Sequence, residues 1–132
     1  MQVKKAIVYI VDDDDSVRGA IKRLLRSMGL EAQAFASGDD FLKSEFRDQN
    51  ACLVADVKIP GMSGLELHQE LIERGFRLPV IFITGFDDEE TRSEARKSGA
   101  FGYFRKPVDD QALLDAIQLA LSPDDKELRR NK

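Results

Sequence analysis

Side chains that could carry chemistry follow four separate apolar segments of this sequence. Asp12 and Asp13 come directly after the first segment, and Asp56 comes directly after another. Thr84 ends a further apolar segment, and Lys106 follows a short aromatic one. If these segments are parallel strands of one sheet, their carboxyl ends share an edge, and side chains from distant parts of the sequence converge there.

Such a cluster would have an electrostatic problem that a metal ion can solve. Two carboxylates about 4 Å apart repel by roughly 4 kcal/mol at an effective dielectric constant near 20, so three of them either raise their pKa values or bind a cation. Oxygen ligands in an open site suit Mg²⁺. A carboxylate can then form an acyl phosphate as a nucleophile, while the metal, a lysine and a hydroxyl stabilise the phosphoryl oxygens. The residue types therefore indicate phosphoryl chemistry.

The elements that must position these side chains alternate between apolar strands and helices. Short apolar or β-branched runs predict strands over residues 6–11, 31–35, 52–55, 79–83 and 101–104. Apolar residues at helical spacing follow each run, except over residues 87–98, where Ala95 is the only apolar residue. This alternation predicts an α/β fold with three layers, a doubly wound (βα)5 parallel sheet in the flavodoxin-like order 2-1-3-4-5.

Some side chains have a purely structural interpretation. Met28 and the leucines within residues 65–71 have helical spacing and are expected in the core. Cys52, the only cysteine, begins an apolar run, so we expect a buried thiol. His68, the only histidine, is expected at the surface.

Composition limits the class of protein. The 132 residues, 42% hydrophobic and 33% charged, favour one globular domain, expected over residues 1–121, with 122–132 a charged tail or the start of a linker. A net charge of −4 argues against direct nucleic-acid binding. The apolar runs are too short to cross a membrane, and we recognise no signal peptide. A single cysteine suits a reducing compartment, so we expect a cytoplasmic protein.

The residues described above resemble those of the response-regulator receiver family, in the CheY-like superfamily, over about residues 5–121. The segments that carry the resemblance are Ile10-Val11-Asp12-Asp13-Asp14, Leu53-Val54-Ala55-Asp56, Pro60-Gly61-Met62-Ser63-Gly64, Val80-Ile81-Phe82-Ile83-Thr84-Gly85 and Lys106-Pro107. Residues 8–13, 35–42 and 78–85 are most similar to FixJ-type receivers. The resemblance implies a two-component signalling switch.

The resemblance also implies a phospho-acceptor and a metal site. Asp56 would accept a phosphoryl group from a phosphohistidine of a sensor histidine kinase. Asp13, Asp56 and the backbone carbonyl of Lys58 would bind Mg²⁺ directly, and Asp12 would act mostly through bound water. Such a protein would not be a turnover enzyme, because it would catalyse only its own phosphotransfer and slow dephosphorylation.

The implied switch involves three further residues. Thr84 would move toward the phosphoryl oxygen, Lys106 would pair with it, and Tyr103 would turn inward as Thr84 moves. Homodimer formation on phosphorylation and a C-terminal DNA-binding output domain are compatible with the family. The acid-rich segment 86–97 departs from the FixJ-type pattern, which argues against the usual dimer.

The first helix would carry the kinase-docking surface, formed by the exposed basic residues Arg18, Lys22 and Arg23. The Lys106–Pro107 bond would be cis. Phe86 and Lys58 would border the path of the water that attacks an acyl phosphate. These three expectations come from the family resemblance alone.

Two other classes of protein are alternatives. Asp12-x-Asp14-x-Ser16 after a strand resembles the nucleophile loop of haloacid-dehalogenase-type phosphatases, although the chain is short for that fold and lacks a second acid pair at the required place. Multiple turnover on an aryl phosphate would identify such an enzyme. The second alternative is a binding module of the same fold that has lost phosphorylation, or one that binds a flavin. A flavin would need a phosphate-cradling loop after the first strand, where four aspartates would repel it.

Overall fold

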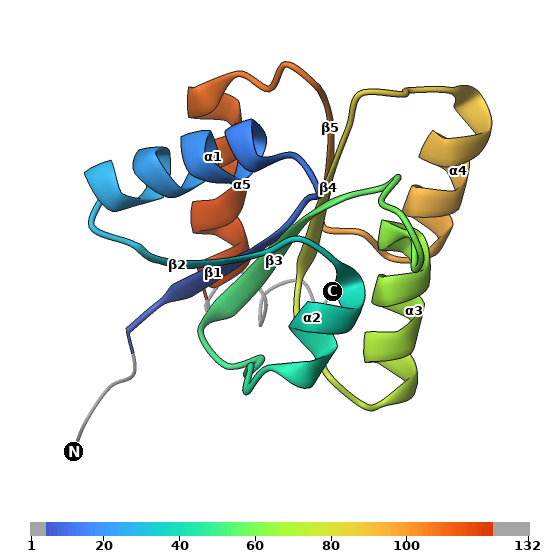
Figure 1. Ribbon diagram of the computed structural model, residues 1–132, viewed down its shortest axis with the longest axis horizontal. Coiled ribbons are helices and arrows are strands. Elements are labelled where there is room, and N and C mark those ends of the chain that lie inside the picture. Colours follow the sequence, from blue (N-terminus) through green and yellow to red (C-terminus); the bar gives the residue numbers. More distant parts are fainter. Residues whose placement is uncertain (1–4, 123–132) are drawn as a thin grey trace.

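The computed structural model describes residues 5–122, in which a helix follows each strand (Figure 1). The strands are β1 (Ile7–Val11), β2 (Glu31–Phe35), β3 (Ala51–Asp56), β4 (Val80–Thr84) and β5 (Gly102–Arg105). The helices are α1 (Asp15–Ser27), α2 (Gly38–Lys43), α3 (Gly64–Glu73), α4 (Glu89–Lys97) and α5 (Asp110–Leu121). All strand pairs are parallel and the order is β2-β1-β3-β4-β5. The predicted fold class is confirmed.

Helices cover both faces of the sheet. Helices α1 and α5 lie on one face, and α2, α3 and α4 lie on the other (Figure 1). Strands β1, β3 and β4 are buried at every position, which explains their continuous apolar sequences. The edge strand β2 is only partly buried, in agreement with its weakly alternating pattern. The sheet core therefore holds the ends of β1, β3 and β4 firmly in place.

The end of α1 corrects one prediction about the core. Met28, expected in the apolar face of this helix, is 50% exposed. The helix ends with the N–H of Gly29 bonded to the carbonyl of Arg26 and the N–H of Leu30 bonded to that of Leu25. Gly29 has a φ of 75°, so the chain reverses there and Leu30 packs against the core in place of Met28.

Residues 1–4 and 123–132 lie outside the described part of the chain. The expected tail or linker over residues 122–132, and the domain boundary at residue 121, therefore stay predictions. Over residues 5–122, none of the helices is long and apolar enough to span a membrane.

Candidate functional site

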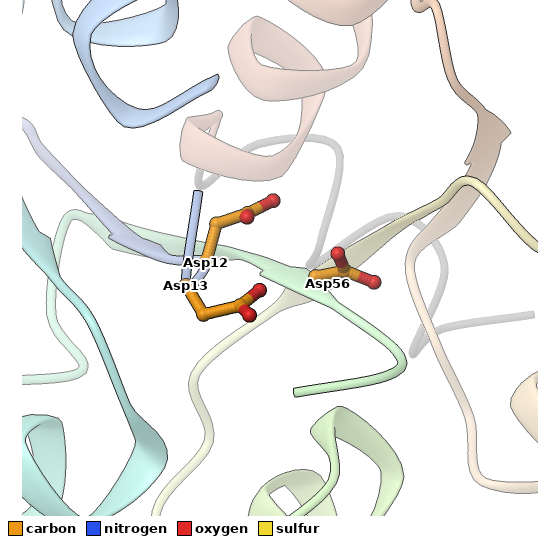
Figure 2. Close-up of side chains that lie close together, drawn as sticks. All are labelled: Asp12, Asp13 and Asp56. Atoms are coloured by element: carbon orange, nitrogen blue, oxygen red, sulfur yellow. The ribbon is translucent and has the colours of Figure 1, made fainter. Parts of the chain in front are cut away.

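Three aspartates meet where β1 and β3 end. Asp12 and Asp13 follow β1 directly, and Asp56 is the last residue of β3. The register pairs Val11 with Ala55, so the residues that follow lie side by side. Carboxylate oxygens of the three aspartates lie within 4.8 Å of one another (Figure 2). The structure thus brings together three residues that the sequence had assigned to one site.

Lys106, which directly follows β5, also reaches this cluster. Its Nζ lies 2.7 Å from Oδ2 of Asp56 and 2.9 Å from Oδ2 of Asp12. Its backbone N–H donates to the carbonyl of Thr84, at 2.7 Å, and its peptide bond to Pro107 is cis. Burial disfavours the ammonium, but the carboxylates of Asp56 and Asp12 together outweigh it and raise the pKa of Lys106. Lys106 therefore stays charged between the two acids.

Asp12 is the most deeply buried acid of the cluster, with no exposed surface. Burial raises the pKa of Asp12, against the opposing effects of Lys106 and of the Asp14 N–H, which donates to Oδ1 at 2.9 Å. Its Oδ2 is near Lys106 but has no aligned donor, and within residues 5–122 it is the only buried side-chain polar atom of this kind. Three crowded carboxylates that share one ammonium keep an excess of negative charge, which fits an additional cation.

The β3–α3 connection fixes the carboxylate of Asp56. The Lys58 N–H donates to its Oδ1, at 3.0 Å, and the carboxyl group is nearly buried. Gly64, the first residue of α3, allows the helix to begin directly against β3, because a Cβ at this position would lie 2.3 Å from the backbone oxygen of Asp56. The sequence shows a glycine in this loop, but only the packing shows why a larger residue is excluded.

The four consecutive aspartates have different roles in the structure. Asp12 and Asp13 face the cluster, whereas the Asp14 side chain caps α1 by accepting from the N–H groups of Ser16 and Val17. Asp15 forms an ion pair with Arg18 in the first turn. Because Asp14 is a helix cap, the geometry does not match the paired acids of the phosphatase alternative.

Arg18 supports the cluster from α1. Its Nη1 donates to the backbone carbonyl of Asp12 at 2.6 Å, and its side chain is only 18% exposed. The expectation that Arg18, Lys22 and Arg23 are all exposed is therefore wrong for Arg18, and Lys22 is also half-buried. Arg18 holds the loop after β1 instead, which its position one helical turn into α1 makes possible.

Thr84 and Tyr103 point away from the acidic cluster toward the β4–α4 loop. The buried Thr84 hydroxyl donates to the backbone carbonyl of Phe86 and accepts from its N–H, at 3.0 Å in both cases. The Tyr103 hydroxyl donates to Oδ1 of Asp87 at 3.1 Å. Near them, the Nζ of Lys58 lies 4.0 Å from the ring centroid of Phe86. The two predicted switch residues thus contact the loop rather than Asp56.

His68 contradicts the prediction of a surface histidine, because it is only 5% exposed. It packs edge-on against Phe82 of β4, and its Nδ1 lies 3.2 Å from Oγ of Ser98. The Ser98 hydroxyl already donates to the carbonyl of Ala95, so the Nδ1–H of His68 is the donor. The ring connects α3 to the end of α4. The polar residues that flank His68 in the sequence suggested the wrong helix face.

Fold and site together define a doubly wound α/β domain with an acidic cluster at the switch point of its sheet. We call this cluster of Asp12, Asp13 and Asp56, together with Lys106, the acidic pocket. The family model for the response regulator receiver domain matches residues 8–118. The chain belongs to the response-regulator receiver family.

Two curated proteins and one solved structure agree with this assignment. The chain is 45% identical over 122 residues to Nodulation protein W of Bradyrhizobium diazoefficiens, covering 92% of this chain and 54% of that protein. It is 41% identical over 114 residues to the transcriptional regulatory protein FixJ of Azorhizobium caulinodans, covering 86% of this chain and 54% of FixJ. The structure of the response regulator StyR superposes with a TM-score of 0.85 at 41% identity, covering 97% of this chain and 64% of StyR. The chain thus spans about half the length of these curated relatives.

Proposed function

We propose that the acidic pocket accepts a phosphoryl group on Asp56 and that this modification switches the conformation of the domain. The observation that carries the proposal is the convergence of three carboxylates within 4.8 Å, with the Lys106 ammonium 2.7 Å from Asp56. Membership of the receiver family supports the same assignment.

The residues of the pocket fit Mg²⁺. Asp13, Asp56 and the backbone carbonyl of Lys58 would bind the ion directly, with Asp12 acting through bound water. The all-oxygen donor set and the excess negative charge of three carboxylates that share one ammonium support this assignment. When bound, the ion would neutralise the crowded carboxylates and the phosphoryl oxygens.

The proposed transfer uses one carboxylate oxygen of Asp56 as the nucleophile. It attacks the phosphorus of a phosphohistidine on a sensor histidine kinase; the new O–P bond forms as the N–P bond breaks, and the departing imidazole keeps the electron pair and takes up a proton. Lys106, already charged beside Asp56, would pair with a phosphoryl oxygen. Thr84 would leave its two contacts with Phe86 and donate its hydroxyl hydrogen to another phosphoryl oxygen.

The conformational change would pass from the pocket to the β4–α4 loop, because Thr84 would release its contacts with that loop. Tyr103 would turn inward as Thr84 moves, which changes the surface formed by α4 and β5. Lys58 and Phe86, which contact each other, would control access of the water that hydrolyses the acyl phosphate. The domain would thus act as a phospho-acceptor with slow self-dephosphorylation rather than as a turnover enzyme.

The relatives suggest the wider context of the domain. FixJ is named as a transcriptional regulatory protein and is about twice as long as the matched region. We therefore propose a receiver over residues 1–121 that works in the cytoplasm with a sensor histidine kinase and, through a linker beginning near residue 122, controls a C-terminal DNA-binding domain. Homodimer formation on phosphorylation belongs to the same proposal.

Labelling with a small phosphodonor tests the proposed function. Acetyl phosphate and Mg²⁺ should place one acid- and base-labile phosphoryl group on each chain, detected by intact mass. Asp56→Asn should abolish the label, whereas Asp39→Asn, a change of an exposed acid on α2, should retain it. Full labelling of Asp56→Asn would contradict the assignment of the acceptor. Multiple turnover on an aryl phosphate would favour a phosphatase instead.

A further inference from the structure

One carboxylate connects the β4–α4 loop, α4 and β5. Asp87, in the loop, accepts a hydrogen bond from the Tyr103 hydroxyl through Oδ1, at 3.1 Å, and contacts Nη2 of Arg92 through Oδ2, at 2.6 Å. Each carboxylate oxygen therefore has its own partner, one on β5 and one on α4. The Asp87 side chain is only 10% exposed, whereas that of Arg92 is 47% exposed.

Asp87 is charged and specifically paired. The Arg92 guanidinium beside it lowers the pKa of Asp87, and burial together with this carboxylate raises the pKa of Tyr103 to about 12. The phenol thus keeps its proton and remains a donor to the carboxylate at neutral pH. Asp88, the next residue, has a different task, because it caps α4 by accepting from the Thr91 N–H at 2.7 Å. The adjacent acids are not interchangeable.

The same loop holds the hydroxyl of Thr84. Both hydrogen bonds of that hydroxyl go to the backbone of Phe86, which immediately precedes Asp87. Thr84 cannot turn toward Asp56 without releasing Phe86, and movement of Phe86 pulls on Asp87. On the other strand, Tyr103 lies three residues before Lys106, whose N–H is bonded to the carbonyl of Thr84. The two ends of the Asp87 network are therefore connected to the phosphoryl pocket through the backbone.

We propose that Asp87, fixed by Arg92, is a positioning residue that holds the Tyr103 hydroxyl against the β4–α4 loop and keeps that loop in its resting position, and so sets how readily the pocket changes state. This inference rests on the proposed function, because the change it restrains is the movement of Thr84 toward the phosphoryl group. Loss of Asp87 or Arg92 makes the resting state less favourable while leaving all pocket side chains in place. Because ligands of the switched state then bind better, the affinity for a phosphoryl mimic increases.

Two pairs of matched variants of the full chain test this restraint. Asp87→Ala is compared with Glu90→Ala, and Arg92→Gln with Arg96→Gln, whose guanidinium has no ion pair within residues 5–122. The probe is beryllofluoride with Mg²⁺, titrated by calorimetry. We expect Asp87→Ala and Arg92→Gln to lower its Kd by about three- to tenfold, the loss of one or two polar contacts, and the controls to leave it unchanged.

A second measurement reports on Tyr103 without any phosphoryl mimic. Alkaline absorbance titrations of each protein, each with its own Tyr103→Phe counterpart as the reference, isolate the Tyr103 phenol from that of Tyr9. Its pKa should be about 12 in the natural chain and lower in Asp87→Ala, where burial remains but the carboxylate is gone. In the Tyr103→Phe background, Asp87→Ala should change the beryllofluoride Kd much less than in the natural chain.

The outcomes separate the possible failures. An unchanged phenol pKa in Asp87→Ala would overturn the contact with Tyr103. A lower phenol pKa with an unchanged beryllofluoride Kd would overturn its coupling to the pocket, as would equal changes in the test and control variants. If no protein binds beryllofluoride and Asp56 cannot be labelled, the proposed function fails; the coupling then fails with it, while the phenol titration still decides the contact.

Discussion

The acidic pocket and the α4 side of the sheet are built by different physical means. The pocket lies at the ends of β1 and β3, whose residues are buried at every position. Helix α4 has only Thr91 and Ala95 buried, whereas α5 buries four apolar residues. Polar contacts fix α4 instead, through Asp87, Arg92, His68 and Ser98. The reactive groups thus sit on a rigid sheet, and the region expected to move is fastened by contacts that cost little to break.

The largest expected effect is on the pocket side. Lys106→Ala should slow labelling by acetyl phosphate about 100-fold, because the charge that faces Asp56 and the phosphoryl oxygens is lost. Lys97→Ala removes an exposed lysine of α4 and should leave the rate unchanged. The rate of mass increase measures both variants. Equal rates for Lys106→Ala and the natural chain would remove Lys106 from the proposed chemistry.

A substitution at the start of α3 tests the rigidity of the pocket. Gly64→Ala should lower the free energy of unfolding by about 1–3 kcal/mol, since the new Cβ would overlap the backbone oxygen of Asp56. Gly38→Ala is the control, because the added Cβ would have only ordinary contacts with Met62 and Leu67. Urea unfolding measures the difference. If both variants unfold alike, the close approach of α3 to β3 is not required.

Hydrogen exchange compares the two helices directly. Backbone amides in the middle of α4 should exchange about tenfold faster than those of α5, because fewer apolar contacts oppose local opening of α4. Arg92→Gln should widen the difference, since it removes the contact with Asp87. Residue-resolved exchange by NMR measures it. Equal protection in α4 and α5 would contradict the contrast between rigid and lightly fastened regions.

The smallest effect concerns acid stability. Burial lowers the pKa of His68 below its ordinary 6.5, so the folded state favours the neutral ring. The stability that the neutral His68 ring contributes is fully present above pH 6.5 and is lost as the pH falls from there through the folded-state pKa. His68→Gln should therefore lose less stability between pH 7 and about 5 than the natural chain. Denaturant unfolding at several pH values tests this; identical pH dependence would show that His68 does not titrate in this way.

Ser98→Ala separates the histidine charge from its hydrogen bond. This variant removes the acceptor of the Nδ1–H of His68 but leaves the buried ring. It should lower stability at neutral pH by about 1 kcal/mol and keep the acid sensitivity. A loss of acid sensitivity in Ser98→Ala would mean that the serine, rather than burial of the ring, controls the pKa of His68.

Much of the fold could be predicted because its signals are local. Continuous apolar runs identify strands buried on both faces, and the alternation with helices leaves few possible topologies. Strand ends were displaced by at most one residue, as in β5, which begins at Gly102 rather than at residue 101. Met28 was misplaced because helical spacing continues in the sequence after the helix has ended.

The sequence by itself determined which reactive residues end each strand, since parallel strands carry Asp12, Asp56 and Thr84 to one edge. Only the tertiary structure decided that Asp14 caps α1, that His68 is buried, and that Asp87 joins Arg92 to Tyr103. The physical reason is that strand order follows from local patterns of hydrophobicity. The partner of a polar side chain depends instead on distances between segments that lie far apart in the sequence.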